Sequence, residues 1–382
     1  MFSTSVIEIS KDSLQHNINF LKNQMGKKVK ISSVVKGNAY GHGIKEFVPL
    51  AEECGLDHFS VYSADEALDV YKYSNGNSDI MIMGMVENEE LEWAINTGIE
   101  FYVFDIDRLK KTIEYASYLN RKAKIHVEIE TGMNRTGFTK EYISSVIKII
   151  KENKDVLSVK GLCTHFAGAE SIANYVRIQK QLKNYSRIHK LFIENNVIPE
   201  KLHTACSAAS MTYPKSRMDM VRIGIMQYGF WSSRETFIGY INNLENKADP
   251  LKRIIKWKSR IMSTKSVKTG EFIGYGTSYL AQRDMKIATI PVGYAHGYSR
   301  ELSNQGRVLI NGHRVSVIGI VNMNMMTIDI TDVSETKKGD EAVLIGKQGD
   351  LAISVASFSE LSNQLDYELL TRLNQKIPRM VV

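Results

Sequence analysis

Residues 124–166 read KIHVEIETGMNRTGFTKEYISSVIKIIKENKDVLSVKGLCTHF. This stretch begins and ends with short apolar runs that are typical of buried strands, KIHVEI (124–129) and VKGLCTHF (159–166). Between them, KEYISSVIKIIKEN (140–153) repeats apolar residues at helical spacing. The stretch therefore predicts a strand, a helix and a second strand in one β–α–β unit.

The same alternation continues on both sides of this stretch. Six more strand-like runs are present, with helical patterns between most of them: VKISSVV (29–35), HFSVY (58–62), DIMIM (79–83), IEFYVF (99–104), KLHTA (201–205) and MVRIGI (220–225). Eight such units in about 230 residues are typical of a parallel (β/α)8 barrel. An open doubly wound sheet would need a G-x-G-x-x-G phosphate fingerprint after its first strand, and none is there. We therefore predict an α/β fold whose residues 1–245 form a (β/α)8 barrel.

The pattern changes near residue 246. From Pro250 onward, strand-like runs dominate, such as RIIKWKSRIMSTKSV (253–267) and EAVLIG (341–346). Asn311-Gly312 lies between two such runs and is a strong hairpin signal. We predict a mostly β domain over residues 246–382, with NNLENKADP (242–250) as the linker.

Composition excludes several classes of protein. The 382 residues are 43% hydrophobic and 24% charged, as in ordinary globular proteins, and no apolar stretch is long enough to span a membrane. The net charge is +7, but no run of five Lys or Arg residues suggests a nucleic-acid partner. Three widely separated cysteines and the absence of a secretory leader pattern favour a cytoplasmic protein. No spacing typical of a metal site is present.

Catalytic residues of such barrels lie where the strands end at their C-terminal edge. The first run ends in VVKGNAYGHG, which places Lys36 at the strand end beside glycines and Tyr40. Desolvation there would free the amine to form a Schiff base, although a lone lysine at a strand end is often simply exposed. Arg135, beyond the fifth strand, suits a substrate carboxylate or a surface ion pair.

The last three strand ends add further polar residues. His165 ends the sixth strand, and HTACSAAS carries Ser207 after the seventh. Arg222 lies within the apolar eighth strand, where burial is costly unless it is paired. The backbone N–H groups of Gly224 and Ile225 could bind a phosphate, as the loops after strands seven and eight often do.

These motifs resemble the alanine racemases, pyridoxal-phosphate enzymes of the barrel type (fold type III). The resemblance runs in family order over nearly the whole chain. It is carried by VVKGNAYGHG (34–43), ETGMNRTG (130–137), HTACSAA (203–209), VRIGIMQYG (221–229), IGYGTSY (273–279), IPVGYAHGYSR (290–300) and IVNMNMMTIDIT (320–331).

The resemblance implies pyridoxal 5'-phosphate as cofactor, a small amino acid as substrate and a homodimer with shared active sites. Lys36 would hold the cofactor and act as one catalytic base, and Tyr275 of the second subunit would be the other. The remaining cofactor-binding residues would be Tyr40, His165, Ser207, Arg222, Gly224 and Ile225. The substrate would contact Arg135, the Met323 backbone and Tyr294.

Four positions depart from the family pattern. Glu128 stands where the family often has a carbamylated lysine, and Asn324 where it has an aspartate. Gln375 replaces a tyrosine and Ile320 replaces an arginine. We expect Glu128 to supply the negative charge of the modified lysine, and we expect the altered entrance to accept serine beside alanine.

Other functions remain open from the sequence. A broad-specificity or serine/alanine racemase would use the same residues. A non-catalytic pyridoxal-phosphate carrier would need neither the β domain nor Tyr275. A decarboxylase of the same barrel type would place an acidic residue, rather than Arg222, at the cofactor's ring nitrogen.

Overall fold

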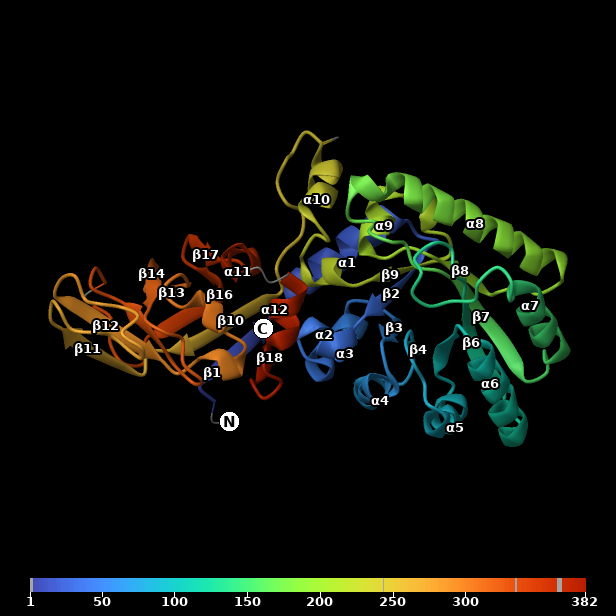
Figure 1. Cartoon of the computed structure of the whole chain (residues 1–382), viewed down its shortest axis with the longest axis horizontal. Coiled ribbons are helices and arrows are strands. Elements are labelled where there is room, and N and C mark those ends of the chain that lie inside the picture. The colour runs from blue at the N-terminus through green and yellow to red at the C-terminus, as the bar shows by residue number, and fades with distance from the viewer. Residues whose placement is uncertain (1–2, 243, 334, 363–365) are drawn as a thin grey trace. The chain divides into compact units, whose positions relative to one another are not determined.

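A computed structural model describes residues 3–242, 244–333, 335–362 and 366–382 (Figure 1). These residues form two compact units. One unit consists of Asp12–Lys36 and Val48–Lys252, and the other of the described residues of Met1–Lys11, Gly37–Phe47 and Arg253–Val382. Residue 243 of the expected linker lies outside the described residues.

The first unit contains a sheet of eight parallel strands in the order β8-β7-β6-β5-β4-β3-β2-β9. The Arg222 N–H donates to the Ala205 carbonyl at 2.9 Å, and the Asp219 N–H donates to Leu202 at 3.1 Å, so β8 and β9 also meet and nearly close the barrel. The predicted barrel and all eight of its strands are confirmed. The strands are β2 (Lys30–Val34), β3 (His58–Val61), β4 (Asp79–Ile82), β5 (Glu100–Val103), β6 (Ala123–Glu128), β7 (Leu157–Cys163), β8 (Lys201–His203) and β9 (Met220–Ile223).

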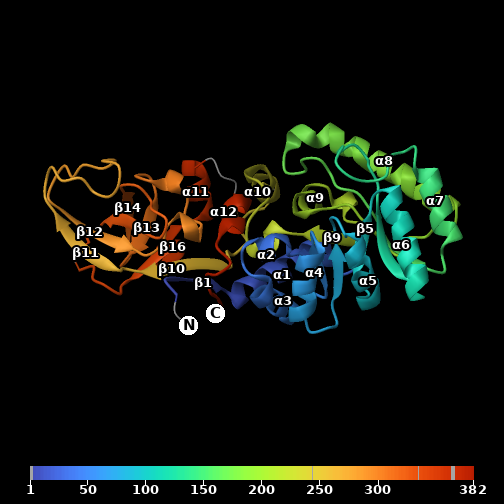
Figure 2. The same cartoon turned by 60° about the horizontal axis from the view of Figure 1, so that its bottom comes forward.

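Helices cover the outside of these strands (Figures 1 and 2). In α7 the buried residues are Ile143, Val146, Ile147 and Ile150, whose spacing forms one apolar face. Burial of such faces on the sheet is what fixes the helices in place. The helices are α1 (Lys11–Met25), α3 (Ile44–Glu53), α4 (Ala64–Tyr73), α5 (Asn88–Thr97), α6 (Ile106–Leu119), α7 (Ile143–Glu152), α8 (Tyr175–Glu194) and α9 (Ser207–Thr212). A further helix, α10 (Arg234–Ile241), packs against α9.

The second unit is built on a mostly antiparallel sheet in the order β11-β12-β15-β14-β13-β16-β10-β1-β18, with β17 paired to β16. The expected hairpin joins β13 and β14, and its turn residues Asn311 and Gly312 have φ of 48° and 77°. Two positive φ values are what the favoured two-residue hairpin turn requires. The elements are β1 (Ser5–Ile9), β10 (Ile255–Arg260), β11 (Ser263–Val267), β12 (Met285–Ile290), β13 (Arg307–Ile310), β14 (His313–Ile318), β15 (Met326–Asp329), β16 (Glu341–Gln348), β17 (Leu351–Ile353), α11 (Val355–Ser362), α12 (Asp366–Arg372) and β18 (Arg379–Val381).

The two units are interleaved in sequence, which the expected division at residue 245 does not describe. Strand β1 pairs antiparallel with β10 and parallel with β18, so the start of the chain belongs to the second sheet. Its side chains alternate between buried and half-buried positions, the period of a strand rather than a helix. Among the described residues, no helix is long and apolar enough to cross a membrane.

Candidate active site

Lys36 directly follows the first barrel strand and begins α2 (Lys36–Tyr40). The next four residues, Gly37 to Tyr40, have φ between 51° and 64°, which makes a left-handed turn. The Gly41 N–H closes this turn on the Gly37 carbonyl at 2.9 Å. Left-handed backbone is unfavourable for residues with a Cβ, so three non-glycine residues store strain immediately after Lys36.

The amine of Lys36 lies in a positively charged environment. Desolvation is the main cause that lowers the pKa of Lys36, and the nearby charges of Arg135 and Arg222 lower it further. Glu66 opposes them by raising it. The net effect favours the neutral amine, the form that can act as a base or a nucleophile. Protein surrounds the amine only in part, because Lys36 as a residue is still exposed in the single chain, and a substrate can therefore reach it.

Arg222 is buried in β9 and is held by backbone carbonyls and by histidine. Its Nη1 donates to the His203 carbonyl at 2.9 Å and to His203 Nδ1 at 2.7 Å, and its Nη2 donates to the carbonyls of Thr164 and Thr204 at 2.9 and 3.1 Å. Within the described residues its Nε–H makes no protein hydrogen bond, so this donor is available to an acceptor on a ligand.

His165 lies beside Arg222, with Nδ1 3.4 Å from Nη2. Desolvation lowers the pKa of His165 to about 3, assisted by the charges of Arg222, Arg135 and Lys36. The imidazole is therefore neutral near pH 7. A neutral ring can lie against a flat aromatic cofactor without adding another positive charge to the site.

Ser207 connects the ends of β8 and β9. The Gly224 N–H donates to the Ser207 hydroxyl oxygen at 2.9 Å, which brings together two of the residues expected to bind phosphate. Ile225 follows as the first residue of a 3-10 helix, Ile225–Tyr228. Tyr40, the fourth expected phosphate ligand, belongs to the other compact unit.

Arg135 lies at the end of a loop that is organised by Glu130. The Glu130 carboxylate accepts the N–H groups of Gly132, Met133 at 2.7 Å, Asn134 at 2.8 Å and Arg135 at 3.4 Å. Sequence reasoning missed this role of Glu130. A carboxylate followed by Gly and Asn in ETGMN was the available signal, because such residues build tight turns.

Glu128 is 5% exposed and lies at the end of β6. Desolvation raises the pKa of Glu128, and the Thr136 hydrogen bond and the charges of Arg135 and Arg222 oppose that rise. No ion pair within 4 Å joins Glu128 to Arg135 in the described part of the chain. Arg135 is near enough for its charge to lower the pKa of Glu128. The orienting role of Glu128 stays a prediction.

Tyr275 is presented by a loop of the second unit. Residues Phe272 and Leu280 bridge the base of this loop, and Tyr275 near its tip is 72% exposed. Gly274 and Gly276, with φ of 77° and 71°, supply left-handed backbone on either side of the tyrosine. The loop thus displays a phenol to solvent in the single chain.

Tyr294 and Met323 lie together in the same unit. The N–H of Tyr294 donates to Asn322 at 3.0 Å, and that of Ala295 donates to Met323 at 2.9 Å. A Cβ on Gly293 would collide with the carbonyls of Asn322 and Met323, so this close approach requires glycine. The Met323 N–H has no acceptor among the described residues, and neighbouring Asn324 is exposed.

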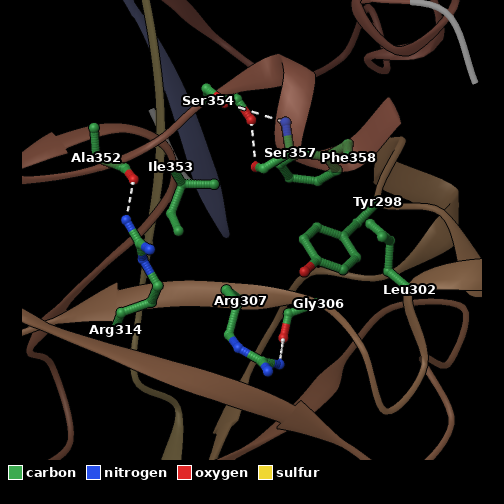
Figure 3. Close-up of a pocket in the computed structure, with 10 residues that line it drawn as sticks. All are labelled: Tyr298, Leu302, Gly306, Arg307, Arg314, Ala352, Ile353, Ser354, Ser357 and Phe358. Carbon is green, nitrogen blue, oxygen red and sulfur yellow. Dashed lines mark hydrogen bonds between the residues drawn. The ribbon is translucent and has the colours of Figure 1, made fainter. Parts of the chain in front are cut away.

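A separate cavity of about 220 Å³ lies in the second unit (Figure 3). Its walls include Tyr298, Arg307, Arg314 and Phe358, and the Tyr298 hydroxyl makes no hydrogen bond within the described residues. None of the expected site residues lines this cavity. The cavity is therefore separate from the residues at the barrel strand ends.

Comparison with known proteins finds matches along the whole chain. Residues 9–231 match the family model described as alanine racemase, N-terminal domain, and residues 254–381 match alanine racemase, C-terminal domain. The alanine racemase of Halothermothrix orenii is 35% identical over 381 residues, which cover 97% of this chain and 95% of the relative.

Comparison with solved structures indicates the same family. The alanine racemase of Clostridium difficile 630 is 30% identical, with a TM-score of 0.90, over 100% of this chain and 96% of that one. The Bartonella henselae alanine racemase, whose structure is described as having covalently bound pyridoxal phosphate, is 25% identical, with a TM-score of 0.85 over the full length of both chains. Together with the two domain models, this shows that the chain belongs to the alanine racemase family.

Proposed function

We propose that this protein interconverts L- and D-alanine and uses pyridoxal 5'-phosphate as its cofactor. One observation above all supports the proposal. Lys36, Arg135 and Arg222 lie close enough at the barrel strand ends for the two arginines to lower the pKa of the Lys36 amine. Lys36 supplies an amine that can lose its proton, and Arg135 supplies a cation that can bind a carboxylate. Arg222 supplies a hydrogen-bond donor that keeps its charge. Membership of the alanine racemase family supports alanine as the substrate.

The residues at the strand ends fit the cofactor. Lys36 would attach it, and the Nε–H of Arg222 would face its ring nitrogen. Its phosphate would lie at Ser207, Gly224 and the N–H of Ile225. When bound, pyridoxal phosphate withdraws electrons from the substrate Cα. Because a guanidinium does not give up its proton, Arg222 would leave the ring nitrogen unprotonated. A weaker pull on the electrons at Cα would disfavour transamination.

Racemisation requires proton transfer on two faces of the substrate. The Lys36 amine, whose pKa is lowered, removes or returns the Cα proton on one face. The Tyr275 side chain exchanges the proton on the opposite face of Cα. Arg135 binds the substrate carboxylate, as does the N–H of Met323, and Tyr294 lines the site. These contacts keep Cα between the two bases.

We infer a homodimer in which Tyr275 of one subunit serves the Lys36 of the other. Tyr275, Tyr294 and Met323 are 72%, 41% and 55% exposed in the single chain, and Phe272 is 56% exposed. Aromatic residues and methionine are enriched at protein interfaces, and exposed groups of them mark interaction sites.

A cytoplasmic location is also proposed, since all three cysteines are free thiols.

Specificity is proposed to be partial. Gln375 and Ile320 are shorter than the aromatic and cationic residues that the resemblance leads one to expect at their positions. One methylene in a pocket decides only about 1–3 kcal/mol. We therefore expect slow turnover of serine beside alanine.

Attachment of the cofactor to Lys36 provides the test of this function. Borohydride reduction of the holoenzyme should fix one pyridoxyl group on the Lys36 peptide, as read by peptide mass spectrometry. The variant Lys36→Ala should take up no label and should not racemise alanine. Labelling of a different lysine in the wild-type protein would refute the assignment of the site.

A further inference from the structure

Three titratable side chains inside the barrel take no direct part in the chemistry proposed above. They are Glu100, His126 and His203, which are 1%, 0% and 0% exposed. The interior of such a barrel is usually filled by branched apolar side chains. Buried ionisable groups are costly unless they are hydrogen-bonded, so these three need an explanation.

The three residues connect Arg222 to the opposite side of the barrel interior through consecutive hydrogen bonds. Arg222 Nη1 is 2.7 Å from His203 Nδ1, His203 Nε2 is 2.8 Å from His126 Nδ1, and His126 Nε2 is 2.8 Å from Glu100 Oε2. We call these four residues the relay. A histidine outside the relay, His58, also contacts Glu100. Its Nε2 is 3.3 Å from the same carboxylate oxygen, away from the path to Arg222.

The chemistry of its two ends fixes the direction of the relay. A guanidinium can only donate, so His203 Nδ1 accepts and its ring proton lies on Nε2. That proton is donated to His126 Nδ1, which places the His126 proton on Nε2, facing Glu100. An ionised carboxylate can only accept. Every hydrogen bond therefore points from Arg222 towards Glu100.

The charge states agree with this direction. Desolvation is the main cause that lowers the pKa of both His126 and His203, so both rings are neutral. Burial alone would raise the pKa of Glu100, but hydrogen bonds from His126 and His58 outweigh it and the pKa is lowered. Glu100 is thus ionised and ready to accept.

The barrel makes room for the contact between the two histidines. A Cβ on Gly161, in β7, would collide with His126 Nδ1 and would lie 2.7 Å from His203 Nε2. The β6–β7 pairing also shifts register between Ile125 and His126, so Lys160 is an extra residue beside Gly161. Such bulges re-aim side chains near functional sites. Glycine and bulge together let His126 meet His203.

We propose that Glu100 is a positioning residue of the racemase: it is the terminal acceptor of the relay that holds the Arg222 guanidinium in place. The inference rests on the function proposed above for its consequence in catalysis. The path itself rests only on the described contacts. Without an acceptor at Glu100, the His126 Nε2–H would be left unpaired in the barrel interior. The rings would then rearrange, and Arg222 would lose its His203 partner.

The wild-type protein gives the first test, and variants serve only to assign its signals. The full-length chain, labelled with ¹⁵N-histidine and free of cofactor, would be measured by long-range proton–nitrogen correlation spectra. His126→Asn and His203→Asn would assign the signals. Both rings should be neutral with the proton on Nε2. A charged ring, or a proton on Nδ1 in either ring, would overturn the relay.

Variants then test the consequence for catalysis. Glu100→Leu should disturb the nitrogen signals of His203 and lower kcat for alanine about 10- to 100-fold, with little change in KM. Glu100→Gln retains an acceptor oxygen and should keep the Nε2–H rings and most of the activity. Equal losses in Glu100→Leu and Glu100→Gln would contradict the acceptor role.

His58→Asn is the matched control, because it removes a hydrogen bond to the same carboxylate away from the path to Arg222. It should lower the melting temperature while leaving the His203 signals and kcat unchanged. If His58→Asn changed the His203 signals as much as Glu100→Leu does, Glu100 would contribute only general packing and not a specific acceptor. If the wild-type enzyme racemises nothing, the proposed function fails, and the histidine spectra still decide the relay.

Discussion

Glu128 is the residue that most distinguishes the proposed active site. It is a buried carboxylate at the end of a barrel strand, beside Thr136 and in the field of Arg135. A charge-assisted contact with Arg135, formed once substrate is bound, would be worth about 1.5–3 kcal/mol. We therefore predict that Glu128 helps to orient Arg135, the residue proposed to bind the substrate.

Substitution of Glu128 by Gln should lower kcat/KM for alanine about 10- to 100-fold, since the negative charge near Arg135 is lost. Cofactor binding, read from the absorbance of the bound chromophore, should be unchanged. Removal of carbon dioxide from the buffer should leave the wild-type rate unaltered. Wild-type behaviour of Glu128→Gln, or inactivation by carbon dioxide removal, would rule out the orienting role.

The raised pKa of Glu128 gives this prediction a pH signature. A carboxyl group with a raised pKa gains its proton at a higher pH than an ordinary glutamate as the solution is acidified. Its charge at Arg135 is present above that pKa and lost below it. KM for alanine should therefore rise on the acid side in the wild type, and this rise should be absent in Glu128→Gln.

Single residues differed in how far the sequence could predict them. Lys36 and Arg222 stand out because a charged residue at the end of, or within, an apolar strand demands an explanation. Glu130 and Glu100 do not stand out, because their roles depend on partners far away in sequence or on a loop shape. His58 and His126, which converge on Glu100, are separated by 68 positions and are adjacent only once the barrel closes.

At the scale of elements, periodicity predicted the barrel strands and the hairpin well. It failed for β1, because a five-residue strand at the start of the chain gains its partners β10 and β18 from the other end of the sequence. It also gave no sign of the left-handed turn after Lys36. Three non-glycine residues there adopt a conformation that local propensity disfavours, so tertiary packing must impose it.

The β13–β14 turn allows a matched test at this scale. Gly312 has φ of 77° and open space around its Cβ position, so Gly312→Ala adds only backbone strain. We expect it to lower the free energy of unfolding by about 1–2 kcal/mol, the cost of left-handed backbone for a residue with a Cβ. Chemical denaturation of the cofactor-free protein would measure it.

Gly239 provides the control, because it lies within α10, also has open space and has no positive φ. Gly239→Ala should stabilise the protein by about 0.5–1 kcal/mol, since alanine loses less backbone freedom in a helix. Equal effects of the two substitutions would show that the hairpin turn does not need positive φ at Gly312.

At the scale of the whole molecule, the proposed shared site predicts complementation between subunits. Lys36→Ala and Tyr275→Phe should each be inactive alone. Mixed under conditions that exchange subunits, they should regain activity, because a heterodimer contains one site with both bases. The recovered rate should approach a quarter of the wild-type rate, for random mixing and independent sites. Proven exchange without recovery would exclude a site shared between subunits.

Racemisation of alanine is the activity proposed for this chain. Incubation of the purified holoenzyme with L-alanine, followed by chiral chromatography of the product over time, would measure it. We expect D-alanine to accumulate until the two enantiomers are equal, with the same end point from D-alanine and no conversion by Lys36→Ala. Failure of the wild-type holoenzyme to form D-alanine, with pyridoxal phosphate bound at Lys36, would contradict this proposal.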